Sequence, residues 1–103
     1  MYKIFLDDER MPEDLAEGWI ICRSSEEAKD LVVSKEKPPN FLALDFDLGG
    51  EDTALNFLRF LYDIYPQDIP DYSVHSSNPC GRMNIISFME TWWKVSNGFL
   101  PRG

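Results

Sequence analysis

The sequence is short of basic residues, and this shortage excludes several kinds of partner. Lysine and arginine together number 10 against 18 acidic residues, which gives a formal net charge of −8. This balance opposes non-specific attraction to DNA, RNA or an anionic membrane, but it permits a local basic pocket for one phosphate. We therefore expect no extended nucleic-acid surface and no membrane contact.

Long apolar runs and cysteine motifs are also missing. No segment approaches the twenty or so consecutive apolar residues that a membrane span needs, and the N-terminus lacks the basic start and apolar middle of a signal peptide. Cys22 and Cys80 do not have the spacing of a metal motif. We expect both to be reduced thiols in or near the core of a cytoplasmic protein.

Enough apolar sequence is present for one core. The chain has 103 residues, of which 44% are hydrophobic and 14% aromatic, a composition typical of a globular domain. Because this length is too short for two cores, we expect residues 1–103 to form a single domain. Trp92 and Trp93 belong to an aromatic stripe that we expect to lie in the core.

Four short apolar segments predict strands, over residues 2–6, 19–22, 41–44 and 72–75. Amphipathic segments predict helices from 25 to before Pro38, from about 53 to 65, and from 79 to about 95. Ser24 and Glu27 fit a capping box, Asp52 or Thr53 can cap the second helix, and Asn78 can cap the third.

This alternation of strands and helices predicts an α/β fold, a small doubly wound parallel sheet of about four strands with helices on its faces. Residues 11–18 contain Pro12 and have room for at most a turn or two of helix, and no clear fifth strand follows the last helix. The carboxyl ends of parallel strands share one edge of a sheet, where ligands bind. The polar residues that end these strands should therefore meet.

Three aspartates at two strand ends predict a metal site. Asp7 and Asp8 follow the first strand and Asp45 follows the third. Such an oxygen-only set suits Mg²⁺, or Mn²⁺, which would keep several waters and leave room for a phosphate oxygen. The alternative is that the acids simply pair with Arg10 at the edge of the sheet.

Asp47 and His75 are candidates for proton transfer. Asp47 fits three roles: a metal ligand, a general base, or an Asx residue that stabilises the loop before Gly49. His75 is the only histidine and ends an apolar strand, so it is either a general acid or base or a structural residue whose hydrogen bonds are satisfied.

Residues able to hold a phosphate stand near the other strand ends. Ser76 and Ser77 can donate to phosphate oxygens or to the loop backbone, and the first turn of the last helix offers free amides and a guanidinium. A helix cap at Asn78 and a surface charge at Arg82 are the alternatives. The candidates are Arg10, Ser76, Ser77, Asn78, Gly81 and Arg82.

The order of these residues resembles that of the response-regulator receiver domain. That resemblance implies that Asp7 and Asp8 hold Mg²⁺, that Asp45 is the phosphoryl-acceptor position, and that Ser76 is the hydroxyl that contacts the phosphoryl group. The chain departs from the pattern in its short first connection and in lacking a fifth strand and the lysine that accompanies it. A phosphorelay role is therefore not predicted.

A closer resemblance is to the cyclic-phosphate processing receiver domain, a divergent branch of the same family. The matching blocks are FLDDERMP at 5–12, Trp19, LDFDLG at 44–49 and HSSNPCGRMN at 75–84. The resemblance implies activity on a cyclic phosphate, either at an RNA end or in a cyclic nucleotide. The sequence thus predicts a phosphoesterase in which His75, Asp47 and Arg82 act in catalysis. The alternative is a non-catalytic module that binds a phosphorylated ligand or partner in the same crevice.

Overall fold

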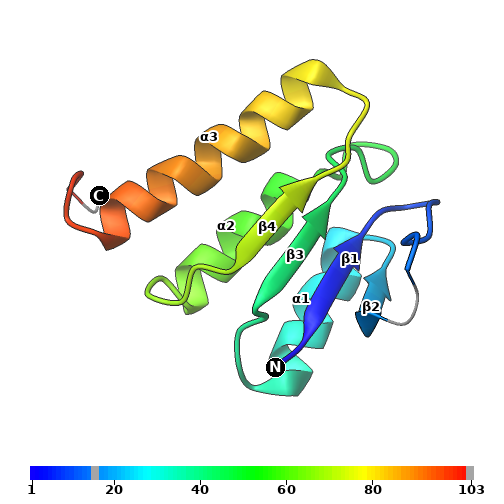
Figure 1. The fold of residues 1–103 in the computed structure, drawn as a ribbon, viewed down its shortest axis with the longest axis horizontal. Helices are drawn as coiled ribbons and strands as arrows, with labels where there is room; N and C mark the ends of the chain where they lie inside the picture. The colour runs from blue at the N-terminus through cyan, green and yellow to red at the C-terminus, as the bar shows by residue number, and fades with distance from the viewer. Residues whose placement is uncertain (15–16, 102–103) are drawn as a thin grey trace.

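The four apolar segments form one parallel sheet in the computed structural model of the chain, which describes residues 1–14 and 17–101 (Figure 1). The strands are β1 (Lys3–Leu6), β2 (Trp19–Cys22), β3 (Phe41–Leu44) and β4 (Asp71–Val74), in the order β2-β1-β3-β4. All three pairings are parallel. The predicted strands are confirmed to within a residue at each end, and the described residues contain no fifth strand.

The three predicted helices are α1 (Ser25–Lys35), α2 (Ala54–Ile64) and α3 (Pro79–Ser96). Ser24 caps α1 by accepting a hydrogen bond from the Glu27 amide, as the capping box predicts. Thr53 is the N-cap of α2 but makes no side-chain cap bond. None of the helices in the described part of the chain is long and apolar enough to cross a membrane.

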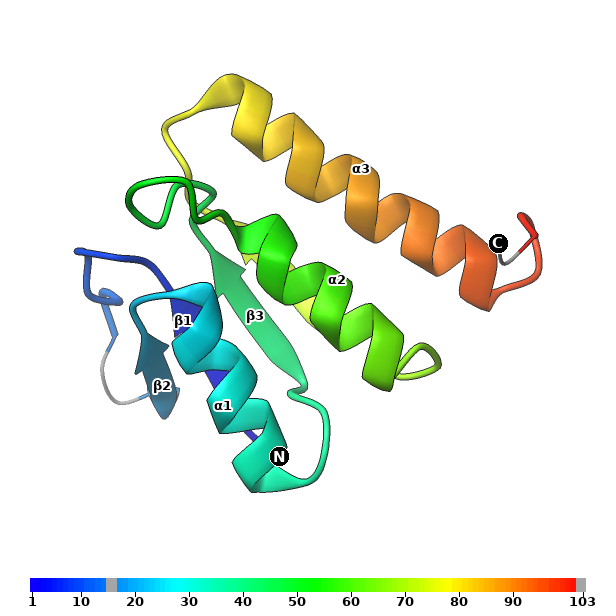
Figure 2. The same cartoon turned by 180° about the vertical axis from the view of Figure 1, so that it is seen from behind.

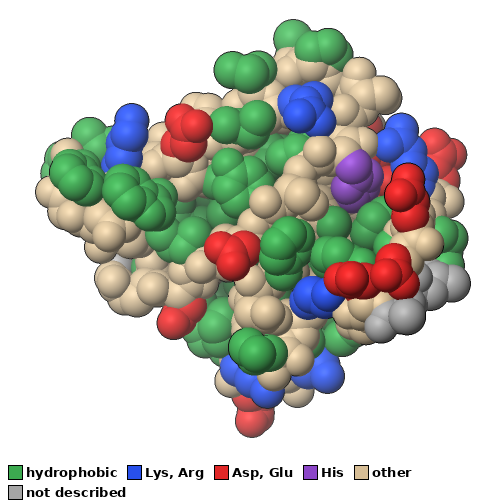
Figure 3. All heavy atoms as spheres, in the orientation of Figure 1, with side chains coloured by type: hydrophobic (Ala, Val, Ile, Leu, Met, Phe, Trp, Pro, Cys, Tyr) green, Lys and Arg blue, Asp and Glu red, His purple; other side chains and the backbone are tan. Residues whose placement is uncertain are grey.

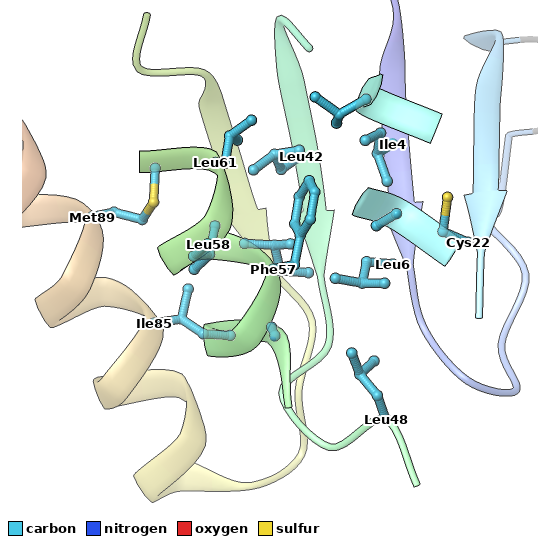
Figure 4. Packing of buried hydrophobic residues seen from close by; sticks show 14 of the residues in the cluster. Ile4, Leu6, Cys22, Leu42, Leu48, Phe57, Leu58, Leu61, Ile85 and Met89 are labelled. Carbon is cyan, nitrogen blue, oxygen red and sulfur yellow. The ribbon is translucent and has the colours of Figure 1, made fainter. Parts of the chain in front are cut away.

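The core lies between the sheet and the helices (Figure 4). Side chains alternate along a strand, so Ile4, Leu6, Leu42 and Leu44 all point to the helical side and are fully buried. The helices contribute residues spaced three or four apart: Phe57, Leu58 and Leu61 from α2, and Ile85, Met89 and Trp92 from α3. Burial of each large apolar side chain contributes about 1.5–3 kcal/mol.

Two residues predicted to lie in or near the core do not. Trp92 is buried, but the side chain of Trp93 is 51% exposed, because α3 covers the core with one face only and the next position turns away from it. Cys22 is buried as predicted, whereas Cys80 is exposed in the first turn of α3. Both cysteines are free thiols, as predicted.

The helical cover lies on one face of the sheet. The strand order starts inside the sheet and extends to both sides, as predicted for a doubly wound sheet. Helices were expected on both faces, but α1, α2 and α3 all contribute to the same core cluster and so cover one face. Figure 2 shows α1 and α2 in front of the strands, on the same side. The connection from β1 to β2 has no α-helix in its described residues, and its residues border the opposite face beside Phe5 and Ala43. We call this helix-free side the open face.

Candidate functional site

The strand ends bring residues from three parts of the sequence to one edge. The parallel register pairs Leu6 with Leu44 and Leu44 with Val74. Backbone hydrogen bonds continue this ladder by one step, from the Asp45 amide to the Leu6 carbonyl and from the His75 amide to the Leu44 carbonyl. Asp7, Asp45 and His75 therefore follow the strands side by side, and alternation places all three on the open face.

Three carboxylates converge at this edge. One carboxylate oxygen each of Asp7, Asp8 and Asp45 lies within 4.8 Å of the other two. Asp7 and Asp45 are buried, and Asp8 is exposed. Burial and the neighbouring charge of Asp7 raise the pKa of Asp45. A divalent cation would neutralise that charge, and three carboxylates are ligands that Mg²⁺ and Mn²⁺ prefer. The residues thus fit the predicted metal.

Asp7 is held by hydrogen bonds on both of its oxygens. Its Oδ1 accepts from the backbone amides of Glu9 at 2.9 Å and Arg10 at 2.8 Å, and its Oδ2 lies 3.0 Å from Nε2 of His75. Burial alone would raise the pKa of Asp7, but the two amide hydrogen bonds and the charge of His75 outweigh burial and lower it. Asp7 therefore stays ionised and fixed in place.

His75 is oriented by two neighbours. Its ring stacks on the ring of Phe5 with centroids 4.7 Å apart and planes 7° apart. Because Asp7 is an ionised acceptor, Nε2 of His75 is the ring nitrogen that donates to it. The backbone carbonyl of His75 accepts from Nη1 of Arg10 at 2.7 Å. These contacts hold the imidazole in one orientation beside the acids.

A hollow of about 410 Å³ lies beside these acids, and we call it the acidic hollow. It has on its wall five residues that the sequence predicts to be functional. These are Asp8, Arg10, Asp45, Asp47 and Ser77, together with Glu9, Gly49 and Gly50.

The other predicted phosphate ligands make structural hydrogen bonds and do not line this hollow. The buried Ser76 accepts from the Asn78 amide at 3.1 Å. Asn78 caps α3, as predicted, by accepting from the Gly81 amide, and its Nδ2 donates to Asp47 at 3.2 Å. Nη1 of Arg82 donates to the Val74 carbonyl at 3.0 Å. The phosphate-binding roles of these residues stay predictions.

Arg23 is a site residue to which the sequence assigns no role. Its Nη1 donates to the carbonyls of Asp7 and Arg10, and its Nη2 contacts Sδ of Met11. The guanidinium thereby ties the segment after β1 to the end of β2. The position of Arg23 directly after an apolar strand was the one feature of the sequence that could have indicated a role at the site. Its hydrogen-bond partners are backbone carbonyls, which cannot be identified from the sequence.

Comparison with known proteins identifies the family of the chain. No curated protein and no solved structure matches the chain. Among protein families, residues 2–91 match the model of the cyclic-phosphate processing receiver domain. That range includes the four strands, the acidic cluster, His75 and most of α3. By this match over most of its length, the chain belongs to the family of cyclic-phosphate processing receiver domains.

Proposed function

We propose that this domain is a metal-dependent phosphoesterase that opens a cyclic phosphate at an RNA end or in a cyclic nucleotide. The observation that carries the proposal is the Asp7–His75 pair, with 3.0 Å between its atoms, next to three converging carboxylates. An acid with only a structural role at the end of a strand needs neither a histidine partner nor neighbouring carboxylates. A reaction that moves a proton next to an anionic phosphate needs both features.

Asp7, Asp8 and Asp45 would hold the Mg²⁺ or Mn²⁺ ion. When bound, the ion would polarise the phosphoryl oxygens and offset their negative charge. Burial and the charge of Asp7 raise the pKa of Asp45, so a cation held beside Asp45 would offset an unfavourable negative charge.

His75 would move the proton. Asp7 accepts from Nε2, so Nδ1 takes a proton from the attacking water as the water oxygen bonds to phosphorus. The bond from phosphorus to one ring ester oxygen breaks, and that oxygen takes a proton from solvent, which leaves a phosphate monoester. Asp47, held by Asn78 on the wall of the acidic hollow, is the second candidate for proton transfer.

Arg10 and Ser77 would contact the phosphate from the wall of the acidic hollow. Arg10 uses Nη1 for the carbonyl of His75, and its Nε lies 4.0 Å from Oδ2 of Asp7, as in the alternative pairing of the acids with Arg10, so Nη2 is the group that would contact an anion. The guanidinium of Arg82 is a second candidate for anion binding, which would act after it leaves the Val74 carbonyl.

The test is incubation with 2′,3′-cyclic nucleotides and RNA ending in a cyclic phosphate, with Mg²⁺ or Mn²⁺. We expect ring-opened monoesters, detected by phosphorus NMR. Asp45→Asn should abolish both turnover and Mn²⁺ binding, whereas Asp63→Asn, which removes an exposed carboxylate from α2, should leave both unchanged. Unchanged Mn²⁺ binding in Asp45→Asn would show that the metal assignment is wrong.

One observation favours a second candidate function, a non-catalytic module that binds a phosphorylated ligand. The ring of His75 is already occupied by Phe5 on one face and Asp7 at Nε2, as in a structural histidine. A binding module should show saturable affinity without turnover across a broad panel of cyclic phosphates. It should also tolerate His75→Ala as long as Arg82 is retained.

A further inference from the structure

A second hollow lies on the open face, next to His75. Its volume is about 430 Å³, which falls within the roughly 300–1,000 Å³ of small-molecule sites. Figure 3, drawn in the orientation of Figure 1, shows the single histidine in purple beside hydrophobic side chains, with acidic and basic side chains gathered nearby. We call this the face hollow.

The face hollow exists because small side chains stand where no helix covers the sheet. The register aligns Phe5 with Ala43 and Ala43 with Ser73 in one row across three strands. Ala43 and Ser73 are too small to fill the space between their neighbours. The half-buried Trp19, whose ring centroid is 6.1 Å from that of the buried Phe5, supplies aromatic surface beside this floor, and His75 supplies a second ring.

The face hollow adjoins the acidic hollow, from which Arg10 separates it. Arg10 lines both of them, and His75, which lines the face hollow, contacts Asp7 of the acidic cluster. A ligand with an anionic group in one hollow would therefore extend its neighbouring part into the other. This arrangement suits a molecule that joins a phosphate to a flat ring.

The charges around the face hollow indicate whether it would bind a second phosphate group or a nucleotide base. Its lining includes the carboxylates of Glu13 and Glu17, and Glu17 is held 3.0 Å from Nζ of Lys3, which in turn lies over the Trp19 ring. Carboxylates repel phosphate but accept hydrogen bonds from the exocyclic amino groups of guanine, adenine and cytosine. Aromatic rings stack on any base.

We propose that the face hollow holds the base of the nucleotide whose cyclic phosphate lies in the acidic hollow, and that it prefers amino-bearing bases to uracil. This inference rests on the proposed function for the position of the phosphate. It assigns Trp19, Ala43 and Ser73 to substrate recognition, a role that the acidic cluster alone does not imply.

The test compares guanosine 2′,3′-cyclic phosphate with glycerol 1,2-cyclic phosphate, which has the same five-membered ring without a base. We expect the nucleotide to bind about 5- to 150-fold more tightly, the range that stacking of one base supplies. Guanosine alone should quench the fluorescence of Trp19, a readout that requires neither turnover nor metal. The uridine compound should bind more weakly than the guanosine one.

A matched pair of variants locates the effect. Trp19→Leu should remove the preference for the nucleotide, and Trp19→Phe, which keeps an aromatic ring, should retain most of it. The control is Trp93→Leu, since that indole is half exposed on α3 and outside the face hollow. Melting curves of all three variants show whether each is folded.

The outcomes separate the two proposals. If cyclic phosphates are not hydrolysed but guanosine quenches Trp19, the enzyme proposal fails and the base site stands. If both cyclic phosphates are hydrolysed with equal KM and Trp19 is not quenched, the base site is overturned and the enzyme stands. A Trp19→Leu variant that changes only the oligomeric state would identify the face hollow as a contact between copies, and would also overturn the base site.

Discussion

Substitution of Gly81 by alanine should disturb both stability and the site. Gly81 lies in the first turn of α3, and a Cβ at this position would stand 2.4 Å from Cγ and 2.7 Å from Cβ of Phe46. Normal carbon–carbon contacts are about 3.5–4.0 Å. Rotation of the ring moves Cγ little and does not move Cβ of Phe46, so the backbone of α3 or of the loop after β3 must shift.

The expected size of the effect follows from two opposing terms. Overpacking costs about 1–3 kcal/mol, and the upper end applies because three atoms of Phe46 lie within 3.0 Å of the added carbon. The higher helix propensity of alanine offsets this loss of stability by up to about 1 kcal/mol. The net loss of about 2 kcal/mol should lower Tm by about 8–16 °C in a domain of this size.

The assay is thermal and urea denaturation together with a Mn²⁺ titration. Phe46 stands between Asp45 and Asp47, and its amide donates to Oδ1 of Asp45 at 2.9 Å, so a displaced Phe46 should also weaken metal binding. Ser87→Ala, at an exposed position on α3, is the control and should change stability by less than about 0.5 kcal/mol.

A double-mutant cycle makes the reasoning refutable. Phe46→Ala removes the Cγ and Cδ2 contacts and leaves only the 2.7 Å approach of Cβ, so Gly81→Ala should cost less in that background. An equal cost in both backgrounds would show that Phe46 is not the obstacle. A Gly81→Ala protein more stable than wild type would refute the argument outright.

Three further outcomes are expected. Asp52→Asn should lower the free energy of unfolding by about 1 kcal/mol at pH 7, because burial raises the pKa of Asp52 but hydrogen bonds from the start of α1 outweigh burial and lower it. Urea denaturation should show the difference between variant and wild type shrinking as the pH falls below about 4, where the Asp52 carboxylate of the wild type becomes protonated. Iodoacetamide should modify Cys80 but not Cys22 in the native protein, by mass spectrometry, since burial raises the pKa of Cys22 to about 11. Trp92→Phe should cost about 1–2 kcal/mol in urea denaturation, because the indole N–H no longer donates to the carbonyl of Pro66.

The strands and the helix caps could be predicted because their signals are local. An apolar run between breakers such as Pro38 and Gly49 specifies a strand wherever it lies, and Ser24 or Asn78 specifies a helix start through its own neighbours. The convergence of Asp7 and Asp45 then followed from the geometry of parallel sheets.

Contacts with main-chain atoms could not be predicted in the same way. Arg10 and Arg82 donate to the carbonyls of His75 and Val74, and every residue in a chain offers such a carbonyl. Asp52 and Thr53 were both candidates for the cap of α2; Thr53 is the N-cap, and Asp52 instead accepts from the backbone and side chain of Ser25 in the preceding helix. A sequence shows which side chains can donate or accept hydrogen bonds, but their partners depend on the tertiary structure.

The connection between β1 and β2, which has no α-helix in its described residues, borders both hollows. Residues 5, 43 and 73 form one row across the sheet and residues 7, 45 and 75 form the next, and by alternation both rows belong to the open face. A helix in the first connection would pack on Phe5 and Ala43 and fill the face hollow. Without it, the ring of His75 contacts Phe5 on one side and Asp7 at Nε2. The short connection, in which the sequence departs from the receiver pattern, thus leaves the face hollow next to His75 without a covering α-helix in the described residues.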